Sequence, residues 1–514
     1  MAVAAVAAIL AAVAMVAPAP AGGAPGDRPR VADDVPVTPV DLVQVRANNS
    51  PALAVDPTEP RFVVLANRLD LPVFGCSLHL SGDGGRGWVA VDPVPTLPRG
   101  AERCYGPEVA FDAKGTLYFL FVGLAGAGNT PVGVYLTTST NRGRSFSPPQ
   151  RLLGADKFGV RMAIDPTLGR RGRIHLVWID AGARPALGGF APVANPIVAA
   201  HSDDGGRTFS APVAVSDPDR ARVVAPALAV GPDHDVHVAY YDLGADAVDY
   251  QGLEGPTWEG TWSLVTAHSS DAGGRFSPGV VVDDAVVPPE RVMLVFTMPP
   301  PALAAGPGGR VYAAWYDARN GDWDVFLRRS GDGGRSWEAA VRLNDDALGN
   351  RRHQYLPRLG VAPGGRVDAV FYDRRDDPEN LANHLSYTFS ADGGATFSSN
   401  MRLSDLASSS RTGPRYPIPS AAGLIEFGSR LALVSGDDEA MAAWTDTRNS
   451  RPGQQQDVFA TSVVFRERPA VTEGRSGGGG NGAAVVALVG GLGLLVLAGV
   501  AARRWRRAGA VPAT

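Results

Sequence analysis

Short apolar segments recur along the chain at an interval of about 60 residues. Four of them alternate apolar and other residues with a period of two and close on an aromatic residue and an Asp. They are Ile174–Asp180, Val236–Asp242, Val311–Asp317 and Val367–Asp373. Alternation with this period is typical of half-buried β-strands. The pattern therefore predicts an all-β protein built from a repeated sheet unit.

A second pattern follows these segments in the repeat. The frame Ser-x-Asp-x-Gly-x-(Thr/Ser)-aromatic occurs six times, with small departures, and we call each copy a Ser-Asp turn. The copies span Ser81–Trp88, Ser139–Phe146, Ser202–Phe209, Ser269–Phe276, Ser330–Trp337 and Ser390–Phe397. Their acidic position holds Asp83, Asn141, Asp204, Asp271, Asp332 and Asp392. A carboxylate that accepts hydrogen bonds from nearby N–H groups, followed by a Gly that supplies a positive φ, predicts a hairpin turn.

These repeated turns resemble the Asp-box (BNR repeat) of the sialidase superfamily, and the resemblance covers about Val35 to Phe465. It implies a β-propeller in which each Ser-Asp turn joins the third and fourth strands of a blade. In that superfamily the box is a structural turn away from the active site. The resemblance therefore predicts a fold and leaves the chemistry open.

The number of repeats predicts seven blades. After the sixth turn, Met441–Asp446 and Asp457–Phe465 read as two strands of a seventh unit that has no fourth strand of its own. Residues 44–48 resemble the fourth strand at 341–344, so we expect this N-terminal segment to complete the last blade and remove an exposed edge. Six blades, the usual number in sialidases, is the alternative.

The two ends of the chain differ in composition from the repeats. Residues 1–21 are apolar and end in small residues, as in a signal peptide, although the positively charged first part that is usual in signal peptides is missing. An uncleaved anchor or a misplaced start is the alternative. We expect residues 22–34 to be a spacer, 35–465 the propeller and 466–482 a Gly-rich stem. Residues 483–502 form an uncharged run of membrane-spanning length, and the Arg-rich tail 503–514 predicts a cytoplasmic C-terminus and an extracellular propeller.

Charge and cysteine content narrow the function further. The formal net charge is −4, so nothing indicates a nucleic-acid partner. Cys76 and Cys104 are the only cysteines, and export favours a disulfide between them over two free thiols. No cofactor and no metal site is expected. Asp322 and Asp324 could hold Ca²⁺, but a solvated turn is the simpler interpretation.

Long connections concentrate on one face of the expected propeller. The Ser-Asp turns occupy one face, whereas the 2–3 and 4–1 connections share the other. The long ones cover residues 181–195, 243–261, 282–300, 344–356, 374–384, 405–417 and 447–456. Long loops on a rigid scaffold mark the expected binding face.

The residues that the sialidase resemblance would require are only partly present. Asn49 stands where that family has an arginine that binds the substrate carboxylate, and Asp70 is the one carboxylate in the following 2–3 loop. The nucleophilic Tyr–Glu pair cannot be assigned. Tyr250, Glu254, Glu259 and Tyr416 merely fall on the expected face. A retaining glycosidase needs two catalytic groups at a fixed separation, which the sequence does not establish.

Arginines at the ends of second strands form another candidate site: Arg68, Arg319, Arg375 and Arg448. The last three lie in Asp-x-Arg, so they either bind an acidic ligand together or each fasten a local turn. Trp258 and Trp262 could stack on a sugar or anchor their loop, and Tyr416 is a further ligand-binding candidate. We therefore predict a cell-surface propeller that binds an extracellular ligand such as a glycan. An exo-sialidase or related glycoside hydrolase and a protein-interaction scaffold are the alternatives.

Overall fold

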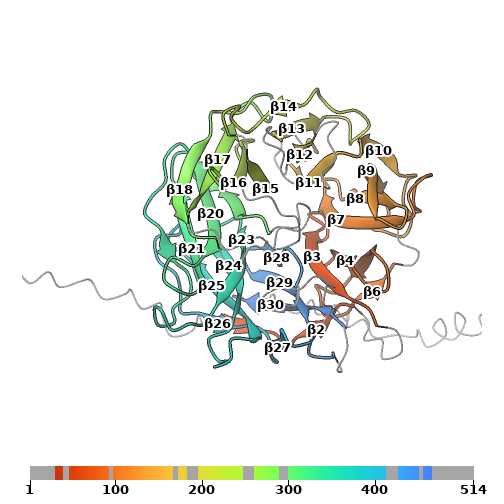
Figure 1. The fold of residues 1–514 in the computed structure, drawn as a ribbon. Coiled ribbons are helices and arrows are strands. Elements are labelled where there is room, and N and C mark those ends of the chain that lie inside the picture. The colour runs from red at the N-terminus through yellow and green to blue at the C-terminus, as the bar shows by residue number, and fades with distance from the viewer. Residues whose placement is uncertain are drawn as a thin grey trace, which may run out of the picture. The chain divides into compact units, whose positions relative to one another are not determined.

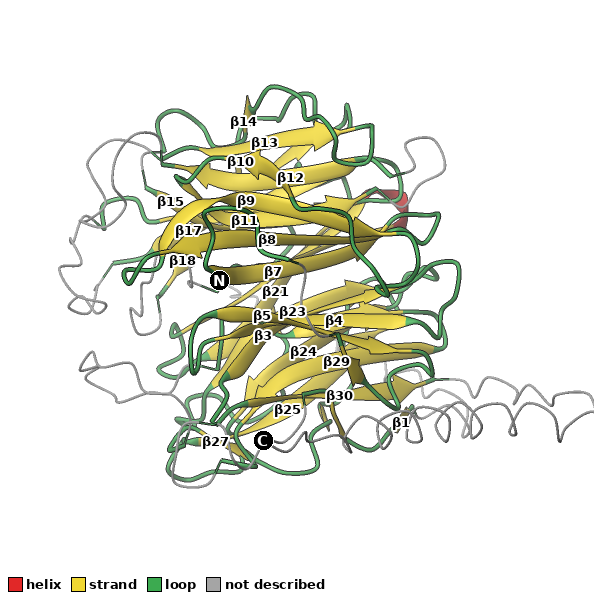
Figure 2. Cartoon of the chain, turned by 90° about the vertical axis from the view of Figure 1, so that its right-hand side faces the viewer, coloured by secondary structure: helices red, strands yellow, loops and turns green. Residues whose placement is uncertain are grey.

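The computed structural model describes residues 29–38, 45–91, 96–165, 172–181, 195–220, 222–246, 260–288, 299–412, 427–450 and 455–465. The predicted signal peptide, stem, membrane span and basic tail lie outside these residues. Within the described part, no helix is long and apolar enough to cross a membrane. The one helical element there is the short 3₁₀ turn Pro307–Gly309, red in Figure 2.

The described residues form seven antiparallel sheets, one per blade, arranged in a ring (Figure 1). Blade one contains β3 (Asn48–Val55), β4 (Val63–Leu69), β5 (Gly75–Ser81) and β6 (Val89–Ala90). Blade two contains β7 (Arg103–Phe111), β8 (Leu117–Ala125), β9 (Thr130–Ser139) and β10 (Gln150–Leu153). Blade three contains β11 (Lys157–Ile164), β12 (Ile174–Asp180), β13 (Ile197–Ser202) and β14 (Val213–Ala214). Blade four contains β15 (Val223–Val230), β16 (Val236–Asp242), β17 (Trp262–Ser269) and β18 (Val280–Val286). Blade five contains β19 (Ala302–Gly306), β20 (Arg310–Asp317), β21 (Asp324–Ser330) and β22 (Val341–Arg342). Blade six is β23 (Gln354–Val361), β24 (Val367–Asp373), β25 (Ala382–Ser390) and β26 (Met401–Arg402), with β27 (Ser408–Ser409) also on β25; blade seven contains β28 (Ala432–Ser435), β29 (Glu439–Asp446) and β30 (Asp457–Val464). The architecture is thus an all-β propeller with seven blades, as the repeat count predicted.

The first strands of neighbouring blades contact one another around the axis in the closed order β3, β7, β11, β15, β19, β23, β28 and back to β3. The ring therefore closes between blade seven and blade one, and several of these inner strands are labelled around the centre of Figure 1.

The N-terminal segment completes blade seven, but the predicted strand was wrong. Two short strands, β1 (Arg30–Val31) and β2 (Val35–Pro36), pair with β30 at its outer edge. Residues 45–48 of the segment expected there instead lead into β3, and Ala47 forms an isolated bridge to Gln456 and backbone hydrogen bonds with Asp70 and Leu71. Strand β1 falls inside the expected spacer. The similarity to residues 341–344 misled because a two-residue edge strand carries almost no sequence signal.

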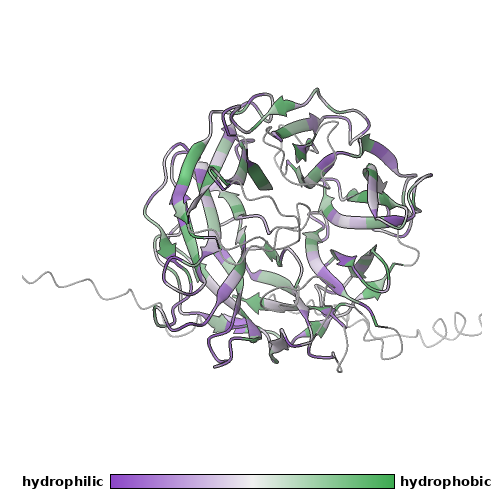
Figure 3. Cartoon of the chain, in the orientation of Figure 1, coloured by the Kyte–Doolittle hydropathy of each residue, from purple (hydrophilic) through white to green (hydrophobic). Residues whose placement is uncertain are grey.

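Second strands form the most buried layer of each blade. Trp178, Trp315 and Trp444, at equivalent positions of β12, β20 and β29, are among the largest fully buried side chains. Apolar clusters join adjacent blades, as where Val64 of β4 lies in the same cluster as Phe119 of β8. Figure 3 shows hydrophobic residues on the strands of every blade, alternating with polar ones. Burial on both faces of a sheet explains why these segments contain so few charges.

The disulfide adds a covalent link between blades one and two. Cys76 of β5 and Cys104 of β7 are bonded, with their Cα atoms 5.5 Å apart. Both are buried.

Each Ser-Asp turn joins the third and fourth strands of its blade. In blade five, Asp332 Oδ1 accepts hydrogen bonds from the N–H groups of Arg335 at 3.0 Å and Ser336 at 2.9 Å. Ser330 Oγ accepts a hydrogen bond of 2.8 Å from the buried N–H of Gly334 and donates one of 2.7 Å to Asp332. The Ser is thus the inner acceptor of the turn and the Asp its outer acceptor.

Every Ser-Asp turn also touches the preceding blade. Its second left-handed residue is always Gly, and a Cβ atom added there would meet that blade at Met441 for Gly85, Leu80 for Gly143, Leu136 for Gly206, His175 for Gly273, His237 for Gly334 and Tyr312 for Gly394. These glycines are needed for the positive φ and, at the tightest positions, also for the close approach. The turns therefore serve the packing between blades.

Candidate functional site

A β-bulge near the start of the inner strand recurs in five blades. The register shifts in β3, β7, β11, β15 and β23, and in each case one residue adopts a positive φ. These residues are Ser50, Gly106, Gly159, Ala225 and Leu356, with φ of 53°, 58°, 57°, 54° and 57°. A bulge bends its strand and redirects the side chain that follows. Here the residues just after the bulges line the propeller axis.

The axial cavity has a volume of about 120 Å³ and is lined by inner-strand residues. Its charged residues are Glu108 of β7, Arg161 of β11, Arg358 of β23 and Arg430, which precedes β28. Three guanidinium groups against one carboxylate leave two positive charges (3 − 1). Since a single water needs roughly 10–15 Å³ measured in this way, there is room for a small oxyanion and several waters.

Two of the three arginines are held in place by the protein. Arg161 Nη1 lies 2.9 Å from Glu108 Oε1, and its Nε donates a hydrogen bond of 3.3 Å to the carbonyl of Pro226. Arg430 pairs with the same oxygen of Glu108 and with the carbonyl of Pro107. Its Nε also donates to the carbonyls of Ser50 at 3.2 Å and Pro51 at 3.1 Å.

Arg358 differs from the other two because it forms no hydrogen bond or ion pair within the described part of the chain. Its side chain is exposed to solvent and lines the cavity. Restricted hydration lowers the pKa of Arg358 to about 10; Glu108 opposes this shift, and Arg430 and Arg161 add to it. The group remains charged at neutral pH, so it is an unpaired cation that a bound anion would stabilise.

Glu108 is ionised under the same conditions. Burial raises the pKa of its carboxyl, but the attraction of Arg430 and Arg161 outweighs burial, and the net shift is downward. An ionised carboxylate held in two ion pairs cannot donate a proton at neutral pH. Among the described residues that line the cavity, Glu108 is the only carboxylate. The described lining of the cavity is therefore suited to binding an anion, and Glu108 is not available there as a general acid.

The arginines predicted from the Asp-x-Arg pattern lie elsewhere and are paired internally. Arg319 contacts Asp317 at 2.5 Å and Asp283 at 2.9 Å. Arg448 contacts Asp446 at 2.8 Å and Asp34, between β1 and β2, at 2.7 Å. These contacts agree with the alternative in which each pair fastens a local turn.

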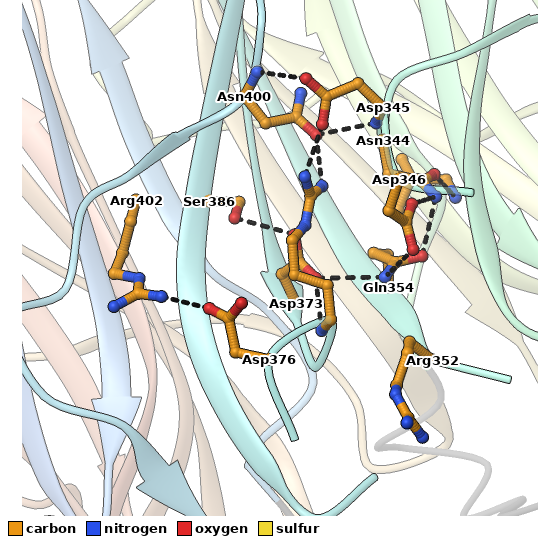
Figure 4. A network of polar contacts seen from close by, with 12 residues as sticks. Asn344, Asp345, Asp346, Arg352, Gln354, Asp373, Asp376, Ser386, Asn400 and Arg402 are labelled. Atoms are coloured by element: carbon orange, nitrogen blue, oxygen red, sulfur yellow. Dashed lines mark hydrogen bonds and ion pairs between the residues drawn. The ribbon is translucent and has the colours of Figure 1, made fainter. Parts of the chain in front are cut away.

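Arg375 makes the corresponding contacts in blade six. It lies 2.6 Å from Asp373, 2.5 Å from Asp345 and 2.6 Å from the side-chain oxygen of Asn400. Figure 4 shows Asp345, Asp373 and Asn400 in this network, which continues to Gln354. The network connects the start of β23 with the end of β24.

Arg68 and the residues expected at a sialidase-like site form one buried cluster. Arg68 pairs with Asp70 at 2.7 Å and donates a hydrogen bond of 2.9 Å to the Tyr105 hydroxyl. Asn49, in the place of the expected arginine, donates one of 2.8 Å to Asp70. A carboxylate that is almost wholly buried and held in this way is not free to act as an acid or base on a ligand.

Trp262 belongs to the protein interior. It is buried, donates a hydrogen bond of 3.0 Å to Asp246 and lies against Tyr241, so it anchors its loop. Trp258 and Tyr416, as well as Tyr250, Glu254 and Glu259, lie outside the described residues.

Asp322 and Asp324 are buried, so the solvated turn expected there was wrong, and burial raises the pKa of Asp322. Asp324 forms an ion pair with Arg342 at 3.0 Å and accepts a hydrogen bond of 2.6 Å from the side-chain amide of Asn344. No group of three or more metal-ligating side chains suited to a metal ion occurs in the described ranges.

Sequence reasoning missed the cavity residues. A signal was present: Glu108 follows Gly106-Pro107 and Arg358 follows Leu356-Pro357 at equivalent positions of two inner strands. Pro removes a donor from the strand and favours a bulge. The convergence of Arg161, Arg358 and Arg430 depends on ring closure between blades far apart in sequence, which no local pattern shows.

Comparison with known proteins gives remote structural similarities only. No protein-family model and no curated protein matches the chain. A protein of unknown function from Dyadobacter fermentans is 14% identical, with 86% of this chain and 100% of that one covered at a TM-score of 0.46. The phage phi92 endosialidase is 11% identical, with coverages of 87% and 72% and a TM-score of 0.46. The Hadza microbial sialidase Hz136 is 14% identical, with coverages of 80% and 75% and a TM-score of 0.41.

Proposed function

We propose that this propeller binds the acidic group of an extracellular glycan in its axial cavity, without hydrolysing it. The observation that carries the proposal is the convergence of Arg161, Arg358 and Arg430 on one cavity. Among the residues that the structure describes, this cavity holds a single carboxylate and Arg358 is unpaired. Guanidinium groups are suited to carboxylate and sulfate because their planar N–H groups can donate two parallel hydrogen bonds.

The size of the cavity favours recognition of one acidic group over enclosure of a whole sugar chain. Pockets that enclose small molecules usually have about 300–1,000 Å³, and this cavity has about 120 Å³. We infer that the anionic group enters the cavity and that the rest of the glycan remains outside. The extracellular setting rests on the predicted signal peptide and membrane span.

A binding experiment tests this proposal. Purified protein is applied to an array of neutral, uronic-acid-containing, sialylated and sulfated glycans, and the affinities of the bound ones are measured by calorimetry. We expect binding of acidic glycans only, weakened by salt. Arg358→Met should reduce affinity roughly ten- to hundredfold, the effect of about 1.5–3 kcal/mol for a charged hydrogen bond.

Arg402→Met is the matched control, since Arg402 is an exposed arginine that pairs with Asp376 and does not line the cavity. It should bind like the wild type. Equal binding of neutral and acidic glycans, or an Arg358→Met variant with unchanged affinity, would contradict the proposed function.

A further inference from the structure

Glu108 occupies a position that a ligand's anionic group would also favour. Its Oε1 accepts hydrogen bonds from both Arg161 and Arg430, and its side chain lines the cavity along with theirs. A supporting carboxylate would be expected behind the guanidinium groups, on the side away from the ligand. Glu108 instead lines the cavity beside Arg161 and Arg430, and its side chain is exposed to a similar degree, 14% against 18% and 10%.

The arginines do not depend on Glu108 alone for their positions. Arg161 is also held by one backbone carbonyl, and Arg430 by the carbonyls of Ser50, Pro51 and Pro107. Backbone acceptors on the inner strands fix where these guanidinium groups lie. The Glu108 carboxylate therefore mainly neutralises charge within the cavity.

From these contacts we propose that Glu108 is a built-in competitor that limits the affinity of the axial cavity for anions. The inference rests on the proposed anion binding and adds its regulation. An entering anion gains the unpaired Arg358 but meets the negative charge of Glu108 and must share or displace its hydrogen bonds to Arg161 and Arg430. A ligand with several oxygens, such as a carboxylate or sulfate ester, can replace these bonds, whereas chloride cannot replace them in the same geometry. Competition of this kind lowers affinity and raises selectivity.

The test uses the purified full-length protein with inorganic sulfate and glucuronate as probes. Glu108→Gln keeps the size of the side chain and removes its charge. Loss of one negative charge a few ångströms from the anion should tighten sulfate binding roughly ten- to hundredfold, since close charges interact strongly at the low effective dielectric of a protein. Glu102→Gln is the matched control, because Glu102 is exposed, close in sequence and outside the cavity lining. It should leave the affinity unchanged.

Thermal unfolding gives an independent readout. Without Glu108, Arg161 and Arg430 lose their counter-ion, so Glu108→Gln should melt at a lower temperature in the absence of anions. Sulfate should raise its melting temperature more than that of the wild type, because stabilisation grows with the ratio of ligand concentration to Kd. If the variant folds only in sulfate, that result also supports the proposal.

Unchanged or weaker anion binding without the Glu108 charge would overturn the inference. Glu108→Gln that binds sulfate and glucuronate equally or more weakly than the wild type would show that Glu108 supports the arginines. Glu108→Asp covers the case in which Glu108→Gln does not fold at any sulfate concentration: tighter binding than the wild type supports competition, and unchanged or weaker binding contradicts it. Failure of the proposed function would look different, since wild-type binding would then not depend on Arg358.

Discussion

The two acceptors of a Ser-Asp turn should contribute unequally to stability, and the turn of blade five allows this to be tested. In Asp332→Ala, the N–H groups of Arg335 and Ser336 lose their acceptor. Both hydrogen bonds are exposed, so water can replace the carboxylate, and we expect a loss of about 1–2 kcal/mol in the free energy of unfolding. In Ser330→Ala, the N–H of Gly334 loses its acceptor at a site that water cannot reach. An unsatisfied buried donor costs about 1–3 kcal/mol, and the variant also removes the donor to Asp332, so about 2–3 kcal/mol is expected.

The turn of blade two shows what an amide does at the acidic position and so provides a natural control for the Asp332 variants. Asn141 occupies the acidic position there and accepts hydrogen bonds from Ser145 N at 3.0 Å and Ser139 Oγ at 2.9 Å, much as Asp332 does from its own partners. Asp332→Asn should therefore cost less than about 1 kcal/mol. Urea unfolding followed by tryptophan fluorescence measures all three variants, and anion binding by the folded fraction should remain intact. Two results would refute the reasoning: a Ser330→Ala variant as stable as the wild type, or an Asp332→Asn variant as unstable as Asp332→Ala.

Three further predictions concern acid stability, catalysis and orientation. Burial lowers the pKa values of His79, His175 and His237 to about 4. Because these histidines take up protons near pH 6.5 in the unfolded chain, their contribution to stability is fully present above that pH and is lost as the pH falls toward 4. Each histidine should lower the free energy of unfolding by about 2 kcal/mol between pH 7 and pH 5. Urea unfolding measures this loss as a fall in the midpoint, and His79→Leu should make that fall smaller. A midpoint that does not change with pH would contradict the prediction. With Asn49 in place of the carboxylate-binding arginine, purified protein should release no sialic acid from fluorogenic sialosides, and steady turnover would disprove it. We also predict that the face of the Ser-Asp turns lies toward the membrane, because β30 ends on that face just before the predicted stem. A protease site inserted in the loop 243–261 should then be cleaved on intact cells and one in the turn at Asp332 shielded; the reverse accessibility would overturn this orientation.

Much of the fold could be predicted from local sequence patterns. The alternation in segments such as Val311–Asp317 specifies a strand, and the Ser-x-Asp-x-Gly frame specifies its turn, because both depend on contacts within a few residues. Repetition of the unit indicated one closed array with seven units, and the resemblance to Asp-box proteins implied that this array is a propeller. The same locality explains why the Asp-x-Arg arginines were recognised as a group and why their pairing with the neighbouring Asp was a ready alternative.

The tertiary structure decided the closure and the cavity. Strands β1 and β2 together supply four residues at the edge of blade seven, and nothing in so short a segment distinguishes it from a spacer. Arg161, Arg358 and Arg430 belong to blades three, six and seven, so their proximity follows from ring closure, and their direction into the axis follows in part from bulges that depend on the register of strand pairs. Register and closure are properties of contacts between residues far apart in the chain. For that reason the sequence by itself determined a seven-bladed repeat architecture, and only the folded ring brought three guanidinium groups and Glu108 together.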